Sequence, residues 1–75
     1  MFDYRDLIGR IIAKFGSRRA FAKAVGRSEN TISKKLKGKM AITTDDIVKW
    51  SSEEFLDIDN ADIPKYFFTE KVQVN

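Results

Sequence analysis

The stretch SRRAFAKAVGRSENTISKKLKG, residues 17–38, decides the fold because it is typical of two short helices joined by a tight turn. Ser17 suits the start of the first helix, since a serine oxygen can accept one of the unpaired N–H groups there. Gly26 suits the left-handed conformation in which helices end, and Ser28 offers a second cap two residues later. The pattern predicts helices over residues 18–25 and 29–37, arranged as a helix-turn-helix.

The apolar residues of this stretch fall on one side of each predicted helix. Phe21, Ala22 and Val25 share a face of the first helix, and Ile32 and Leu36 share a face of the second. Because Ala22 is small, the two helices can cross closely at that point. The opposite, polar side of the second helix is then available for binding.

The spacing Ala22-x-x-x-Gly26-x-x-x-x-x-Ile32, with its apolar neighbours, resembles the helix-turn-helix of the lambda-repressor-like family, which includes phage Cro and repressor proteins. Two residues depart from the common pattern. Arg27 follows the glycine, where an apolar residue is usual, and Lys35 stands three residues after Ile32, where the core usually continues. The resemblance covers most of the chain and implies a domain that binds double-stranded operator DNA and regulates transcription.

Helical patterns flank this stretch on both sides. An apolar stripe predicts a helix over residues 3–15, with the members Tyr4, Leu7, Ile8, Ile11, Ile12 and Phe15. Thr43 and Asp46 have the spacing of a capping box, which predicts a helix over residues 44–55. The buried face of that helix is open between two sets, one with Ile47, Trp50, Ser51 and Glu54 and one with Val48, Ser51 and Phe55. Met40 and Ile42 are expected to plug the core from the loop, and Pro64 to begin one last helical turn.

These elements predict an all-α fold, a compact bundle of about five short helices that contains the helix-turn-helix in a single domain of residues 1–75. The sequence allows two interpretations of residues 67–75. Their alternation of apolar and polar residues is typical of a strand, and in some Cro-like proteins such a strand pairs across a dimer. The alternative is a flexible tail.

Composition excludes several classes of function. The 75 residues include no cysteine and no histidine, which removes disulfides, thiolate metal sites and the commonest general base. The chain opens on no signal-peptide pattern, and its most apolar run is too short and too charged to span a membrane. We therefore expect a cytoplasmic protein that is not an enzyme, with no cofactor, no metal and no small-molecule ligand.

Charge is distributed unevenly along the chain, whose formal net charge is +3. Residues 1–40 contain eleven basic and three acidic residues, whereas residues 41–75 contain three basic and eight acidic ones. The basic half also carries the helix-turn-helix. This coincidence is the electrostatic pattern of a nucleic-acid binder.

The residues expected to contact bases lie on the outer face of the second motif helix. By the layout of the family, they are Glu29, Asn30, Ser33 and Lys34. Asn30 suits adenine, Lys34 suits guanine, and Glu29 can accept from cytosine. The alternative for Glu29 and Asn30 is ordinary chemistry of a helix start.

The residues expected to contact phosphate are basic or hydroxyl-bearing and surround that helix. They would set register and affinity rather than sequence preference. They are Arg18, Arg19, Arg27, Ser28, Thr31, Lys35, Lys37 and Lys39.

One such helix reads few base pairs, so we expect a homodimer, at least on DNA, on a partly palindromic operator. Its interface is expected in the acidic half, at Trp50, at Phe55 or along the strand Phe68–Val74. The alternative function is a small protein-interaction module of antirepressor or antitoxin type that uses the same fold.

Overall fold

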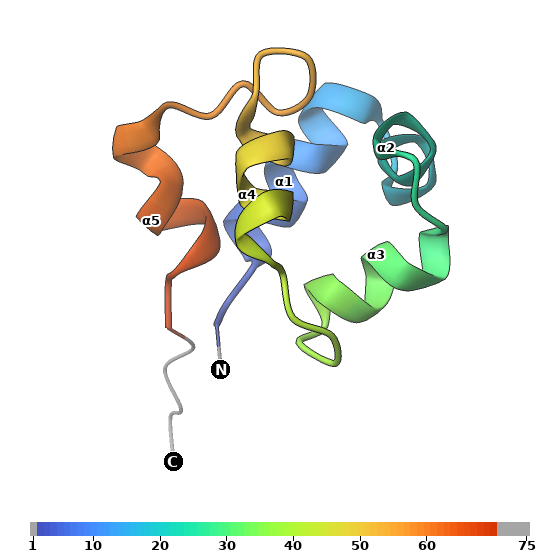
Figure 1. The fold of residues 1–75 in the computed structure, drawn as a ribbon, viewed down its shortest axis with the longest axis horizontal. Coiled ribbons are helices and arrows are strands. Elements are labelled where there is room, and N and C mark those ends of the chain that lie inside the picture. The colour runs from blue at the N-terminus through green and yellow to red at the C-terminus, as the bar shows by residue number, and fades with distance from the viewer. Residues whose placement is uncertain (1, 71–75) are drawn as a thin grey trace.

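The computed structural model describes residues 2–70, and over that range the chain forms five α-helices and one short 3-10 helix. They are α1 (Arg5–Phe15), α2 (Arg18–Val25), α3 (Glu29–Leu36), α4 (Thr44–Ser51), η1 (Asn60–Asp62) and α5 (Ile63–Phe67). Figure 1 shows α1 and α4 at the centre, with α2 and α3 on one side and α5 on the other. The predicted all-α bundle is confirmed.

Local signals place the starts of α2 and α4 as the sequence predicts. The Ser17 hydroxyl accepts from the Ala20 N–H at 3.0 Å, which begins α2. Thr43 and Asp46 form a reciprocal capping box at the start of α4, with bonds of 3.0 and 3.1 Å. Each bond satisfies a backbone donor that the helix itself leaves unpaired.

The core is assembled from all five α-helices around Trp50, which is 1% exposed. Its ring lies 5.1 Å from that of Phe21 in α2 and 6.5 Å from that of Phe67 in α5. Leu7 and Ile11 of α1 are fully buried beside this aromatic group. Trp50 therefore joins the two sides of the bundle.

The fourth helix is shorter than predicted. It ends at Ser51 rather than Phe55, and Ser52 is already extended. Hydrogen bonds from the Leu56 N–H to Trp50 O and from the Ile58 N–H to Ser51 O, both 2.9 Å, turn the chain back on the helix end. These bonds seat Leu56 and Ile58 in the core, which a longer helix would prevent.

Burial settles the phase of α4. Trp50 is buried and Ile47 half-buried, whereas Val48 is 68% exposed. The first predicted set is therefore the inward one, although Glu54 lies beyond the helix and is exposed.

Among the other apolar side chains, two are more exposed than predicted and one packs against the core as predicted. Met40, expected as a core plug, is 41% exposed, whereas Ile42 does pack against the core. Ile12, assigned to the apolar stripe of α1, is 43% exposed. The stripe is thus narrower than its spacing suggests.

The two ends of the described chain lie side by side (Figure 1). Phe2 and Glu70 form an isolated antiparallel bridge, and the Asp3 N–H donates to Thr69 O at 2.6 Å. Within the predicted strand Phe68–Val74, Thr69 and Glu70 thus pair with the start of the same chain. Residues 71–75 of that prediction lie outside the described residues.

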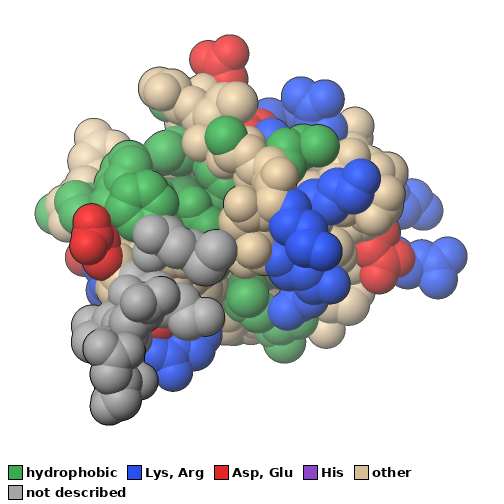
Figure 2. Space-filling view, turned by 90° about the horizontal axis from the view of Figure 1, so that it is seen from below, with side chains coloured by type: hydrophobic (Ala, Val, Ile, Leu, Met, Phe, Trp, Pro, Cys, Tyr) green, Lys and Arg blue, Asp and Glu red, His purple; other side chains and the backbone are tan. Residues whose placement is uncertain are grey.

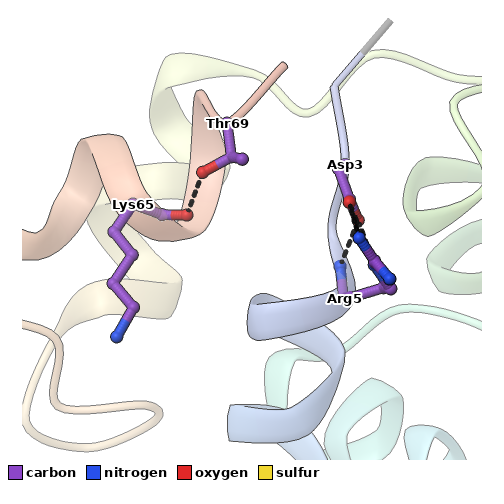
Figure 3. A network of polar contacts seen from close by, with 4 residues as sticks. All are labelled: Asp3, Arg5, Lys65 and Thr69. Carbon is purple, nitrogen blue, oxygen red and sulfur yellow. Dashed lines mark hydrogen bonds and ion pairs between the residues drawn. The ribbon is translucent and has the colours of Figure 1, made fainter. Parts of the chain in front are cut away.

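Side-chain bonds support this junction on both segments (Figure 3). The Arg5 guanidinium bonds the Asp3 carboxylate, with an ion-pair distance of 2.8 Å. The Thr69 hydroxyl donates to Lys65 O at 2.6 Å just after α5. The junction holds α1 and α5 together at the end of the bundle away from the α2–α3 turn.

Candidate binding surface

The turn between α2 and α3 has the local geometry that its sequence predicts. Gly26 has φ +76°, and its N–H and that of Arg27 return to carbonyls of the last turn of α2. Ser28 then caps α3 by accepting from the Thr31 N–H at 3.1 Å, while its hydroxyl donates to Thr31 Oγ1 at 2.9 Å. Only three residues separate the two helices, so α3 is held close to α2.

The four residues expected to contact bases all lie on α3. Glu29, Asn30 and Lys34 are exposed, and Ser33 is half-buried. Ile32 and Leu36 are buried on the opposite side, against the core. The structure therefore brings the predicted base-contacting set onto one accessible face, which we call the α3 face.

The expected phosphate contacts surround this face, with one exception. Ser28 and the basic side chains at 19, 27, 37 and 39 are exposed, and those of Arg18 and Thr31 are half-buried. In the described part of the chain the ion pairs are Arg5–Asp3 and Lys35–Asp46, so these basic residues keep their charge unpaired. Figure 2 shows blue Lys and Arg side chains gathered toward the half of the molecule that carries α2 and α3.

Lys35 is the exception, and its assignment to phosphate contact is wrong. Its side chain is only 8% exposed, and its amine forms an ion pair and hydrogen bond with Asp46 Oδ2 in α4. Lys35 occupies the position at which the core of lambda-repressor-like proteins usually continues. Its aliphatic stem fills that position. The departure noted in the sequence is thus a buried ion pair rather than a displaced surface charge.

The Asp46 carboxylate accepts hydrogen bonds from two partners. Its Oδ2 accepts both from Lys35 and from the Thr43 N–H. Burial alone would raise the pKa of this carboxyl, but the hydrogen bonds from Lys35 and Thr43 outweigh that effect, so the pKa lies below its ordinary value.

Lys49 is a second lysine that sequence reasoning missed. Its amine donates to Val25 O at 2.8 Å, which satisfies a carbonyl at the end of α2 and ties that helix to α4. Nothing in the local pattern around residue 49 identifies this role, since the acceptor lies twenty-four residues away in sequence. Lys35 and Lys49 together attach α4 to both helices of the motif.

The residues named for a dimer interface are placed differently by the structure. Trp50 is buried and cannot contact a partner, which corrects that assignment. Phe55 is half-buried against the core, whereas Phe68 is 48% exposed and lies 5.7 Å, ring to ring, from Phe2.

Residues 2–70 contain no cluster of three or more His, Cys, Asp or Glu side chains suited to a metal ion. Over the same range, none of the helices combines the length and the apolar character needed to cross a bilayer.

Comparison with known proteins identifies the relationship of the chain. The DUF739 family, described as a protein of unknown function, matches residues 1–70. No curated protein matches the sequence. Among solved structures, the chain is similar to the solution structure of the modulator of repression (MOR) of the temperate bacteriophage TP901-1 from Lactococcus lactis.

The likeness to that phage protein extends over nearly the whole of both chains. The two sequences are 43% identical, the alignment covers 96% of this chain and 95% of that chain, and the TM-score is 0.78. The comparisons therefore relate the chain to a phage regulatory protein and name no repressor family. Since the family match spans residues 1–70, the chain belongs to the DUF739 family.

Proposed function

We propose that this chain is a phage regulatory protein that modulates repression by binding a protein of the repression system. The observation that carries the proposal is the likeness to a phage modulator of repression, at 43% identity over 95% or more of each chain. A match of that extent shows that the two proteins share the fold over nearly the whole of both chains. Of the two functions the sequence suggested, it favours the protein-interaction module over a Cro-type repressor.

The character of the exposed surface also supports a protein partner. Five large apolar side chains are at least 40% exposed: Phe2, Ile12, Met40, Val48 and Phe68. Phosphate contacts make no use of such side chains, whereas the centre of a protein–protein interface is apolar. In Figure 2, green hydrophobic side chains gather toward the half of the molecule opposite the blue ones.

The experiment that tests the proposal uses the repressor encoded by the same phage or prophage. The purified chain is titrated into that repressor by calorimetry, and the repressor's affinity for its operator is measured with and without the chain. We expect a complex with a Kd at or below about 1 μM and a changed operator affinity. Absence of a complex, together with unchanged operator binding, would reject the proposal.

A second candidate function is direct operator binding by a homodimer, with α3 in the major groove. It is favoured by one observation, the exposure of Glu29, Asn30 and Lys34 on the α3 face within a ring of unpaired cations. With about six phosphate contacts, affinity for DNA would fall roughly 10³-fold between 50 and 200 mM salt. Asn30→Ala and Lys34→Ala would then reduce sequence preference while leaving non-specific affinity.

A charge reversal separates the two functions. Arg18→Glu with Lys34→Glu removes cations that face the groove in the second function, so operator binding would be lost. Under the first function the chain alone does not bind the operator, so the change can alter only the complex with the repressor. Lys14→Glu with Lys65→Glu is the matched control, because it changes the net charge equally at exposed positions on α1 and α5.

A further inference from the structure

The Lys35–Asp46 pair is a buried contact between two helices that are otherwise joined by a loop. Lys35 lies in the last turn of α3 and Asp46 in the first turn of α4, and both side chains are 8% exposed. Between them the chain passes through Gly38, at φ +79°, and the exposed Met40. The N–H groups of Lys39 and Met40 both donate to Lys34 O and so fix the loop to the end of α3. The pair adds the direct side-chain contact between α3 and α4.

A buried ion pair is weak evidence for stability. Removing two charges from water costs several kcal/mol, and buried ion pairs are often replaced by apolar residues with no loss of stability. The neighbouring residues Ile32 and Leu36 already show that apolar side chains fit this face of α3. An ion pair differs from them in having one hydrogen-bonded partner and a preferred direction, whereas apolar contacts are non-directional.

The position of the pair determines what it can control. Adjacent residues of a helix point about 100° apart, so Lys34 projects outward where Lys35 projects inward. A rotation of α3 about its axis would move Lys34, Asn30 and Ser33 together. Asp46 is itself held, because its carboxylate also accepts from the Thr43 N–H in the capping box.

We infer that the Lys35–Asp46 pair is a positioning device, which sets the rotation of α3 and thereby the direction in which the α3 face is presented to its partner. Lys35 and Asp46 touch no partner; they act through Asn30, Ser33 and Lys34. The binding part of this inference rests on the proposed function, whereas the orientation of α3 can be judged on the isolated protein.

The test replaces the pair by apolar residues of similar size. Lys35→Met with Asp46→Leu removes both charges, and Lys37→Met with Asp45→Leu makes the same changes at exposed neighbours on the same two helix ends. Three quantities are measured for each: the Tm, the amide chemical shifts of α3, and affinity for the repressor. We expect the buried double variant to keep a Tm near that of the parent, to shift the α3 amides, and to bind about tenfold more weakly.

Several results would overturn the inference. Parent-like α3 amides in the buried double variant would show that the pair does not orient the helix. Displaced amides with unchanged affinity would show that the rotation of α3 is irrelevant to binding. If the parent itself binds no repressor, the proposed function fails, and the amide shifts alone then decide the inference about orientation.

A second variant covers the case in which the double variant does not fold. Asp46→Glu keeps the charge and supplies the usual capping-box residue, but it moves the carboxylate by one methylene. We expect a folded protein with displaced α3 amides and affinity reduced about threefold, at the lower end of effects transmitted through another residue. Amides and affinity equal to those of the parent would contradict the inference.

Discussion

The α2–α3 segment and the segment from Ser52 to Asp62 reach their conformations in different ways. In the first, each helix end has a local cause: Ser17 and Ser28 cap, and Gly26 turns left-handed. In the second, the chain is directed by distant groups. Arg10 of α1 donates to Leu56 O at 2.8 Å and to Asp57 O at 2.9 Å, and Asp57 is held at φ +49°.

The irregular segment depends for its conformation on residues that are distant in sequence, whereas the helix pair does so much less. A capped helix pair specifies its own ends, whereas an irregular segment exists only where the rest of the molecule supplies hydrogen-bond partners. The following predictions test this contrast, beginning with Trp50, which contacts both segments.

Truncation of Trp50 should have the largest effect, because its ring contacts both sides of the bundle. Trp50→Ala removes the contacts with Phe21 and Phe67 and should lower the unfolding free energy by about 3–5 kcal/mol. Denaturant titration followed by circular dichroism measures the loss. Val48→Ala, on the exposed face of the same helix, is the control and should change stability by less than about 0.5 kcal/mol.

Loss of Lys35 should destabilise the protein in a pH-dependent way. Lys35→Met leaves Asp46 buried without its partner, which should cost about 3 kcal/mol at pH 7. In the parent, the lowered pKa of Asp46 contributes stability that is present above about pH 4 and lost as the pH falls through the folded pKa. Without Lys35, the carboxyl loses interactions that lower its pKa, so acid should relieve part of the penalty.

The difference in unfolding free energy between parent and Lys35→Met should therefore shrink as the pH is lowered from 7 to 3. Equilibrium unfolding at several pH values measures it. A difference that stays constant, or grows, would mean that the carboxylate is not the group left unsatisfied.

Removal of Arg10 should affect the second segment alone. Arg10→Met keeps the aliphatic stem but removes the donors to the carbonyls of Leu56 and Asp57. The unfolding free energy should fall by about 1.5–3 kcal/mol. Amide exchange should increase over residues 52–62 and stay unchanged over residues 17–38. Equal increases in both segments would show that they are not independent.

A pair of glycine substitutions gives the smallest expected effect. Gly9 is exposed within α1, and a Cβ there meets nothing within 4 Å, so Gly9→Ala should stabilise by about 0.5–1 kcal/mol. Gly16→Ala, at φ +83°, should instead destabilise by about 1 kcal/mol. Thermal unfolding compares the two, and an equal sign for both would contradict the backbone argument.

The same contrast explains how much the sequence could predict. The helix ends at Ser17, Gly26, Ser28 and Thr43 follow from neighbours within four residues, and the structure confirms them. The early end of α4 could not be predicted, because it depends on Leu56 and Ile58 returning to carbonyls near the helix end.

The binding surface was predicted less completely than the fold. The exposed positions of Glu29, Asn30 and Lys34 follow from helical periodicity. Lys35 was misassigned because lysine is usually exposed, and only its partner Asp46, eleven residues on, explains its burial. Periodicity and charge also cannot distinguish a DNA partner from a protein partner, since both use an exposed, cationic helix face.

One measurement tests the central claim, that the chain acts on repression through a protein. Fluorescently labelled operator DNA is titrated with the chain alone, with the repressor alone, and with the two together, and its anisotropy is followed. We predict that the chain alone leaves the anisotropy unchanged, while it alters the repressor's binding curve at stoichiometric concentration. Sequence-specific binding by the chain alone, with a repressor curve that does not move, would contradict the account.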